Sequence, residues 1–319
     1  MNMKTVYLNK FMSSVVTELE KNGQYGTAHV CGSVLRSVMA FGGEGLPVSG
    51  ITPLWLKAYE GYLLHKGGKG LAWNTVSTYM RMLQAVYNRA VVRKLAAFIP
   101  HQFRDVFTGR KADHRRVLER DDMQKLLVER EPDITSPGMA WARACLELMF
   151  RFHGMPFVDL AHLRKSDLKD GYLTLRRRKT GMPLSARVDG RAMQLLERYR
   201  NRDDTSPYLL CFLDGNLEGM AAYRDYQRIL RLLNSRLRAL ALWKKVQGKV
   251  TSYSARHTWA TVGRYCHIPI EVISEGLGHA SVTTTEGYMK GFGNSRMDRA
   301  NKVIMNYIFK GLSNAVDKW

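Results

Sequence analysis

The stretch IPIEVISEGLGHASVTTTEGYMK, residues 268–290, combines a helix end with candidate site residues. It contains a Leu-Gly-His step at 277–279, where a glycine ends a helix and a histidine follows, and it carries Tyr288 nine residues after His279. Upstream, SYSARHTWAT (252–261) places an Arg-His pair at the start of a helix. Taken singly, these features are typical of helix caps, packing residues or surface pairs. Their order and spacing together indicate a functional site.

The charge of the chain indicates the class of partner. The 319 residues include 49 Lys and Arg against 28 Asp and Glu, which gives a formal net charge of +21. An excess of this size favours a polyanionic partner, most often nucleic acid. A ribosome-associated or merely soluble basic protein is the alternative. A hydrophobic content of 45% is ordinary for a globular protein and excludes a disordered chain.

Composition also bears on the compartment and on metals. No apolar run reaches the ~20 residues of a membrane helix, and the start MNMKTVYLNKF lacks a signal-peptide core. Both point to a soluble intracellular protein. Cys31, Cys145, Cys211 and Cys266 form no CxxC pair, so we expect them to be reduced and mostly buried. With no HExxH motif either, no metal and no cofactor is expected.

The first part of the chain predicts a helical bundle. Apolar residues recur at helical spacing over 11–19 and 28–40. Thr52-Pro53 predicts a helix start with a cap and a first-turn proline. Asn74 is the predicted cap of the next helix. We therefore expect a small helical domain over residues 1–108.

A basic connector follows this bundle. The segment 100–120 has few apolar residues and is rich in arginine, which is typical of a solvated linker and also suits a phosphate backbone. We place the linker at 109–118 and expect Arg115 and Arg116 to contact DNA. The second domain then covers 119–319.

The pattern changes in this second domain. Tyr-Leu-Thr-Leu-Arg-Arg-Arg at 172–178 alternates as a strand does, and 183–188 can return as its partner after a turn. The remainder is mainly helical, with expected helices over 121–128, 140–152, 190–201 and 221–246, and again after 252. The fold class is therefore mainly α with a small antiparallel β-sheet (α+β).

The combination Arg-His-Thr-Trp-Ala-Thr, Leu-Gly-His and Tyr resembles the tyrosine recombinase (phage integrase) family. The segment GKGLAWNTVSTYMRMLQAVYNRAV (68–91) resembles the core-binding helical domain of that family, so the resemblance spans nearly the full chain. It implies a SAM-like core-binding domain before a catalytic domain. Tyr253 lies where the family usually has histidine, which makes the conjugative-transposon integrase and DNA invertase branch the most similar.

The resemblance implies a role for each matching residue. Tyr288 would be the nucleophile, forming a 3′-phosphotyrosyl link that needs no ATP. Arg256 would be the second active-site arginine, bidentate to phosphate. His279 would donate a hydrogen bond to a nonbridging oxygen, with His257 in support. Lys179 would protonate the leaving 5′-oxygen; in the alternative, it is a phosphate anchor like Arg176, Arg177 and Arg178.

One departure from the family concerns its first arginine. Pro156 stands at that position, with Asp159 where the family has a carboxylate. A protonated His153 is our preferred substitute, and Arg151 is its rival. Asp159 is expected to hold nearby backbone or a basic side chain.

The same resemblance implies partners. The implied partners are double-stranded DNA at a specific site and an accessory DNA-bending protein, with no membrane. The chain would be a monomer when free and a homotetramer on DNA. Its location would be the cytoplasm, at the nucleoid. The amphipathic segment 298–312 would dock onto a neighbouring protomer; packing on its own domain is the alternative. Two other functions stay open: a DNA-binding protein that has lost catalysis, and a type IB topoisomerase-like activity.

Overall fold

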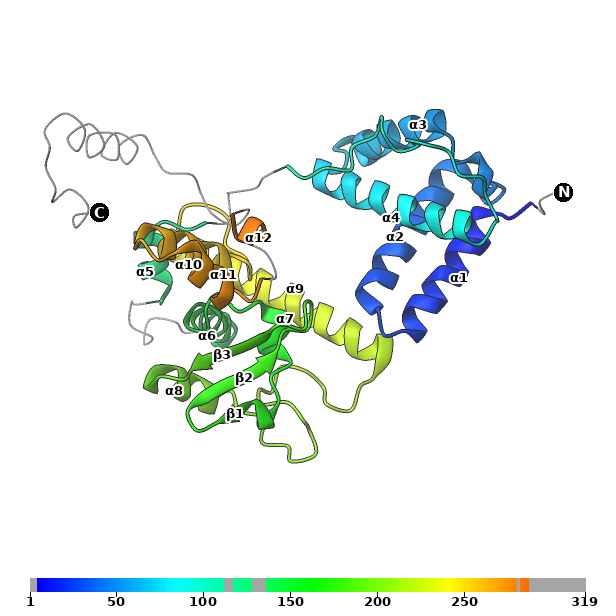
Figure 1. Ribbon diagram of the computed structural model, residues 1–319. Coiled ribbons are helices and arrows are strands. Elements are labelled where there is room, and N and C mark those ends of the chain that lie inside the picture. Colours follow the sequence, from blue (N-terminus) through cyan, green and yellow to red (C-terminus); the bar gives the residue numbers. More distant parts are fainter. Residues whose placement is uncertain (1–4, 112–116, 128–135, 280–281, 287–319) are drawn as a thin grey trace, which may run out of the picture. The chain divides into compact units, whose positions relative to one another are not determined.

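The structure is a computed structural model that describes residues 5–111, 117–127, 136–279 and 282–286. The chain divides into two compact units, which are treated separately. Unit 1 comprises Met1–Ala112 with Leu217–Tyr223, and unit 2 comprises Asp113–Asn216 with Arg224–Trp319. The helices and strands of both are labelled in Figure 1.

Unit 1 is built from four long helices (Figure 1). Helix α1 packs along α2, and α4 packs against α2 and α3. Their apolar stripes meet in one core, in which side chains such as Phe11, Val34, Leu56 and Met80 are buried. Burial of such stripes drives helix association. The helices are α1 (Leu8–Lys21), α2 (Tyr25–Gly42), α3 (Pro53–His65) and α4 (Trp73–Val92), with short 3-10 turns η1 (Val48–Gly50) and η2 (Lys66–Gly68).

The two predicted helix starts in unit 1 have different outcomes. Thr52 caps α3 as expected, because its hydroxyl accepts a hydrogen bond from the Trp55 backbone N–H at 3.2 Å. The predicted Asn74 cap is wrong. Helix α4 begins at Trp73, after Ala72, and the Asn74 side chain is bonded to Lys111 instead.

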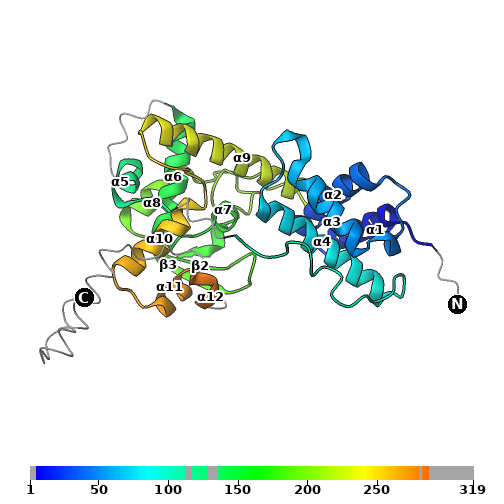
Figure 2. The same ribbon diagram turned by 90° about the horizontal axis from the view of Figure 1, so that it is seen from above.

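Unit 2 is organised around α6 (Pro137–Arg151). Every residue of α6 from Ala142 to Met149 is buried, since α5, α7, α8 and α10 all contact this helix. Figures 1 and 2 show α10 and α11 side by side. The remaining helices are α5 (Arg120–Leu127), α7 (Phe157–Ala161), α8 (Gly190–Arg198), α9 (Gly219–Trp243), α10 (Ser254–Tyr265), α11 (Ile270–Gly276) and α12 (Val282–Glu286), with the 3-10 turn η4 (Lys165–Asp167).

The sheet of unit 2 has three antiparallel strands in the order β1-β2-β3. β2 (Tyr172–Arg176) pairs with β3 (Pro183–Arg187), and the sequence did not predict the short β1 (Leu168–Lys169). Because alternate residues face opposite sides, Leu173 and Leu184 are buried in the core. The hairpin therefore holds its turn, residues 177–182, at one end of the sheet.

The fold class expected from the sequence is confirmed: the described chain is mainly helical with one small antiparallel sheet. Among the described helices, none is both long and apolar enough to cross a bilayer. All four cysteines are free thiols; Cys31 and Cys145 are buried, whereas Cys211 and Cys266 are exposed, so the expectation of mostly buried cysteines is half right.

Candidate active site

Arg256 is the centre of the site. It lies in the first turn of α10 and is only 2% exposed. Its Nη1 donates to the Gly154 carbonyl at 3.0 Å, and its Nη2 donates to the Leu277 carbonyl at 2.7 Å. The same Nη2 lies 2.7 Å from His279 Nε2. Two segments that are distant from Arg256 in the sequence, one at Gly154 and one at 277–279, thus meet at its guanidinium.

Two glycines allow this close approach. Gly154 has φ +67°, and a Cβ placed there would lie 2.9 Å from the Arg256 Cα. Gly278 has φ +62°, and its Cβ would meet the Arg177 side chain at 3.0–3.2 Å. Both positions combine a left-handed backbone with a crowded neighbour, so only glycine suits them.

Arg177 forms a second guanidinium site beside Arg256. Its Nε is 2.8 Å from Asp159 Oδ2, and the two side chains are 5% and 1% exposed. Its Nη1 donates to the same Leu277 carbonyl that Arg256 uses. The sequence analysis grouped Arg177 with the phosphate anchors Arg176 and Arg178, whereas in the structure it is buried beside Arg256. Asp159 also accepts from the Arg178 backbone N–H at 3.0 Å, so it holds a basic side chain and nearby backbone, as expected.

His279 is held in one tautomer. Arginine can only donate, so His279 Nε2 accepts from Arg256, and Nδ1 must carry the proton that bonds to Thr285 Oγ1 at 2.8 Å. Burial, together with the nearby charges of Arg256, Arg177 and Lys179, lowers the pKa of His279 to about 4. The imidazole is therefore neutral at pH 7 in the DNA-free protein.

This pKa predicts a pH dependence of stability. The pKa of His279 falls from 6.5 to about 4 on folding, so the unfolded chain binds the proton more tightly. The stabilisation is complete above pH 6.5 and decreases as the pH drops toward 4. We expect the thermal midpoint to fall less steeply between pH 6.5 and 4.5 in His279→Gln than in the wild type. Parallel curves for the two proteins would contradict the assignment.

His162 serves as the comparison for this measurement. Burial also lowers its pKa to about 4, and it packs between Tyr208 and Tyr226 rather than at the arginine cluster. In His162→Gln, the thermal midpoint should also fall less steeply between pH 6.5 and 4.5, without a change in the interactions of Arg256. The double variant should then show the sum of the two effects, because His162 bonds to the Val158 carbonyl whereas His279 bonds to Arg256 and Thr285.

Lys179 lies at the exposed turn between β2 and β3. Arg177, the first residue of this turn, donates to the Leu277 carbonyl, so the turn lies beside the cluster, and the charge of Lys179 contributes to the lowered pKa of His279. Arg176 and Arg178 are also exposed there, and Arg176 Nη1 bonds to the Gly181 carbonyl at 3.2 Å. This end of the sheet therefore presents several cations toward solvent.

Tyr253 and His257 flank Arg256 on α10. Tyr253 is the N-cap residue and is 39% exposed, whereas His257 is buried. Their rings are 6.3 Å apart between centroids, at an interplanar angle of 49°. Tyr253 can thus present its hydroxyl at the surface of the site while His257 packs behind it.

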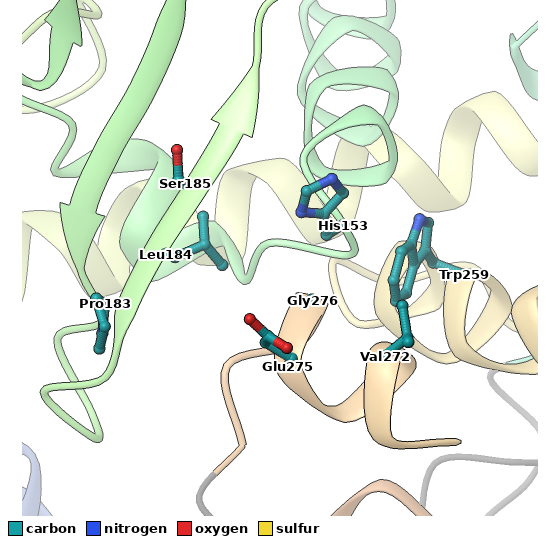
Figure 3. A pocket seen from close by; sticks show the side chains of 8 residues that line it. All are labelled: His153, Pro183, Leu184, Ser185, Trp259, Val272, Glu275 and Gly276. Atoms are coloured by element: carbon teal, nitrogen blue, oxygen red, sulfur yellow. The ribbon is translucent and has the colours of Figure 1, made fainter. Parts of the chain in front are cut away.

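His153 lines a cavity of about 390 Å³ in unit 2 (Figure 3). The cavity is formed by β3, α10 and α11, and the ring of His153 lies 5.6 Å from that of Trp259. Burial lowers the pKa of His153, which favours the neutral ring in the free protein. Its rival Arg151 is bound by Glu147 at 3.0 Å and Asp189 at 2.6 Å, on the α6–α8 side. The substitute for the family's first arginine stays a prediction.

Several predicted residues lie outside the described part of the chain. These are the nucleophile Tyr288, the linker residues Arg115 and Arg116, and the segment 298–312. Their roles stay predictions from the sequence.

The described cluster has the chemistry of a phosphate site. Two buried guanidiniums share one carbonyl, a lysine-bearing turn lies nearby, and the adjacent imidazole is neutral. Guanidinium forks bind phosphate oxygens through parallel hydrogen bonds and stabilise the charge that develops in phosphoryl transfer. Fold and site together describe a candidate phosphate-binding cluster in a chain with a helical unit and a mixed helix–sheet unit.

Comparison with known proteins identifies the family. The family model described as "Phage integrase family" matches residues 116–292, and the one described as "Phage integrase SAM-like domain" matches residues 7–104. The first alone covers more than half of the chain, so the chain belongs to the phage integrase family.

Curated relatives agree with this assignment. Tyrosine recombinase XerA of Pyrococcus furiosus is 29% identical over 140 residues, which cover 43% of this chain and 46% of that protein. The putative integrase/recombinase y4gC of Sinorhizobium fredii is 27% identical over 180 residues, covering 54% and 88%. The match thus spans about half the length of the archaeal relative.

Solved structures share the fold. A lambda integrase dimer bound to a core site aligns with a TM-score of 0.64 and 18% identity, covering 91% of this chain and 97% of that one. The Tn1549 transposon integrase in complex with a circular intermediate DNA gives 0.64 and 14%, covering 94% and 99%. A lambda integrase tetramer bound to a Holliday junction gives 0.59 and 15%, covering 90% and 78%.

Proposed function

We propose that this chain is a site-specific DNA recombinase that cuts and rejoins DNA through a 3′-phosphotyrosyl intermediate. The observation that carries the proposal is the buried Arg256 cluster, in which Arg256 and Arg177 both donate to the Leu277 carbonyl and Arg256 also contacts His279. Membership of the phage integrase family supports it. The names of the curated relatives, tyrosine recombinase and integrase/recombinase, agree.

The chemical step needs no ATP, because the phosphotyrosyl link keeps the energy of the cleaved phosphodiester bond. The Tyr288 hydroxyl loses its proton to solvent as its oxygen attacks the scissile phosphorus, the bond from phosphorus to the 5′-oxygen breaks, and Lys179 protonates that leaving oxygen. Arg256 stabilises the negative charge on the nonbridging oxygens of the transition state. Attack by a 5′-hydroxyl from the other strand then reverses the step and releases the tyrosine.

His279 changes its hydrogen bonding in this scheme. In the DNA-free protein its Nε2 accepts from Arg256 and has no proton to donate. A phosphate oxygen that accepts from Arg256 instead would free Nε2, and its negative charge would raise the pKa of His279. The histidine can then donate to a nonbridging oxygen. DNA binding thereby converts the acceptor into a donor.

The proposed partner is double-stranded DNA carrying a recombination site. Residues 1–108 would bind DNA, residues 109–118 would link the domains, and residues 119–319 would carry out catalysis. The protein would be a monomer when free and a homotetramer on DNA. It would act in the cytoplasm, at the nucleoid. Dimers and a tetramer of lambda integrase on DNA support an assembly of this kind. The net charge of +21 supports strong, salt-dependent DNA binding.

A nicked suicide duplex from the flanks of the chain's own genomic locus tests the proposal. The short fragment released by cleavage carries the 5′-hydroxyl and diffuses away. Its loss prevents the reverse reaction and traps the covalent complex. We expect a denaturation-resistant protein–DNA band with wild type and none with Tyr288→Phe, and the phosphopeptide should map to Tyr288. Salt-sensitive binding without any adduct would overturn the recombinase assignment in favour of a DNA-binding protein. Relaxation of supercoiled plasmid lacking the site would favour a topoisomerase.

A further inference from the structure

The last segment of unit 1, residues 105–111, is bound to α3 and α4 by side chains. We call this segment the strap. Its backbone is bonded at every second residue: Asp105 O accepts from Lys57 Nζ at 3.1 Å, and Phe107 N donates to Glu60 Oε1 at 2.6 Å. Gly109 O accepts from Ser77 Oγ at 2.6 Å. A period of two is that of an extended chain, so the strap lies across the helices as a strand would.

The C-terminal end of the strap is held most firmly. The Asn74 amide makes two bonds to Lys111: Nδ2 donates to the Lys111 carbonyl and Oδ1 accepts from its backbone N–H, each at 2.8 Å. This reciprocal pair mimics a rung of a β-ladder. In addition, Lys111 Nζ lies 4.4 Å from the centroid of the Trp73 ring, which packs edge-on against Phe107.

The chain is anchored again where unit 2 begins. The Leu118 backbone N–H donates to Thr258 Oγ1 at 3.0 Å, and both residues are buried. Thr258 lies on α10, two residues after Arg256. The connector to the catalytic unit is thus bounded by Asn74 on one side and by the helix of Arg256 on the other.

From these contacts we propose that Asn74 and Ser77 are positioning residues for strand cleavage, because they set the length of the tether between the two units. The inference rests on the proposed recombinase function. With the strap in place, the tether from Lys111 to Leu118 reaches about 25 Å at most. If the bonds of Ser77 and Asn74 to the strap are lost, the tether starts at Phe107 and reaches about 40 Å. A longer tether presents the catalytic unit to the scissile phosphate less often.

The first test needs no DNA. Hydrogen exchange of the full-length protein should show a protected Lys111 amide, and Asn74→Ala should raise its exchange rate about tenfold. The Phe107 amide, bonded to Glu60, should stay protected. Thr78→Ala is the matched control, because Thr78 lies on the same helix and its Oγ1 donates to the backbone carbonyl of Asn74. Equal Lys111 exchange in wild type and Asn74→Ala would overturn the strap.

The second test uses the nicked suicide duplex. Asn74→Ala with Ser77→Ala should lower the rate of covalent complex formation about two- to fivefold, while binding to the duplex changes less than twofold. Ser77 is only 1% exposed, so Ser77→Ala alone should shift the rate in the same direction without removing a DNA contact. Unchanged urea unfolding would show that the effect is not a loss of stability.

The outcomes separate this inference from the proposed function. If wild type forms no adduct, the recombinase assignment fails, while the exchange experiment still decides whether the strap exists. If wild type forms the adduct and the double variant matches its rate despite losing Lys111 protection, the positioning role is overturned. A parallel loss of binding and of rate would also overturn it, because Asn74 would then be a DNA contact.

Discussion

Arg256→Ala is expected to lower the single-turnover rate of covalent complex formation by about 10³-fold. The guanidinium is buried and already oriented by the carbonyls of Gly154 and Leu277, so no reorganisation is needed when phosphate arrives. Loss of such a preorganised donor removes stabilisation of the transition state rather than of the bound DNA. The rate should be measured on the nicked duplex at saturating protein.

Two further variants make this prediction sharp. Arg256→Lys keeps the charge but loses the planar fork, so its rate should still fall by about 10²-fold. Arg264→Ala removes the same charge from the same helix, eight residues and about 12 Å further along, and should leave the rate within a few-fold of wild type. If Arg256→Ala and Arg264→Ala lost the same amount, Arg256 would contribute only net charge.

Local patterns in the sequence predicted much of the fold. Thr52-Pro53 predicts the start of α3 because a cap and a first-turn proline act within one turn. Alternation over 172–178 predicts β2. The same period of two also predicts which side chains of this segment face the core. Continued one residue past the end of β2 at Arg176, this period places Arg177 on the same side as Leu173, and both side chains are buried. That signal could have separated Arg177 from the phosphate anchors Arg176 and Arg178 and indicated that it is buried in the site.

What the sequence did not predict depends on contacts between distant segments. Asn74 is a favourable helix cap by type, yet its amide pairs with Lys111, 37 residues away. The Leu277 carbonyl joins Arg256 and Arg177, but a carbonyl has no signature in a sequence. Motif spacing therefore identified Arg256 and His279 as site candidates, whereas the hydrogen bonds between them required the tertiary structure.

Arg177→Ala is expected to lower the free energy of unfolding of unit 2 by about 3–5 kcal/mol. The Arg177–Asp159 pair is almost completely buried, so truncating one partner leaves an uncompensated carboxylate in the core. The Leu277 carbonyl also loses the hydrogen bond that Arg177 donates. Asp159 keeps its bond to the Arg178 backbone N–H, but its negative charge is no longer neutralised by Arg177. Urea unfolding at pH 7 measures the effect.

Neighbouring substitutions distinguish this buried pair from a surface charge. Arg176→Ala, at an exposed position next in sequence, should change stability by less than about 0.5 kcal/mol. Arg177→Met combined with Asp159→Leu removes both charges and should recover much of the loss, because no unpaired ion stays buried. The recovered double variant should still cleave DNA slowly, since the Leu277 carbonyl and the adjoining Gly278 turn would no longer be held against the lysine-bearing hairpin. Equal destabilisation by Arg177→Ala and Arg176→Ala would show that Arg177 is a surface cation, and the cluster around Arg256 would then have to form without it.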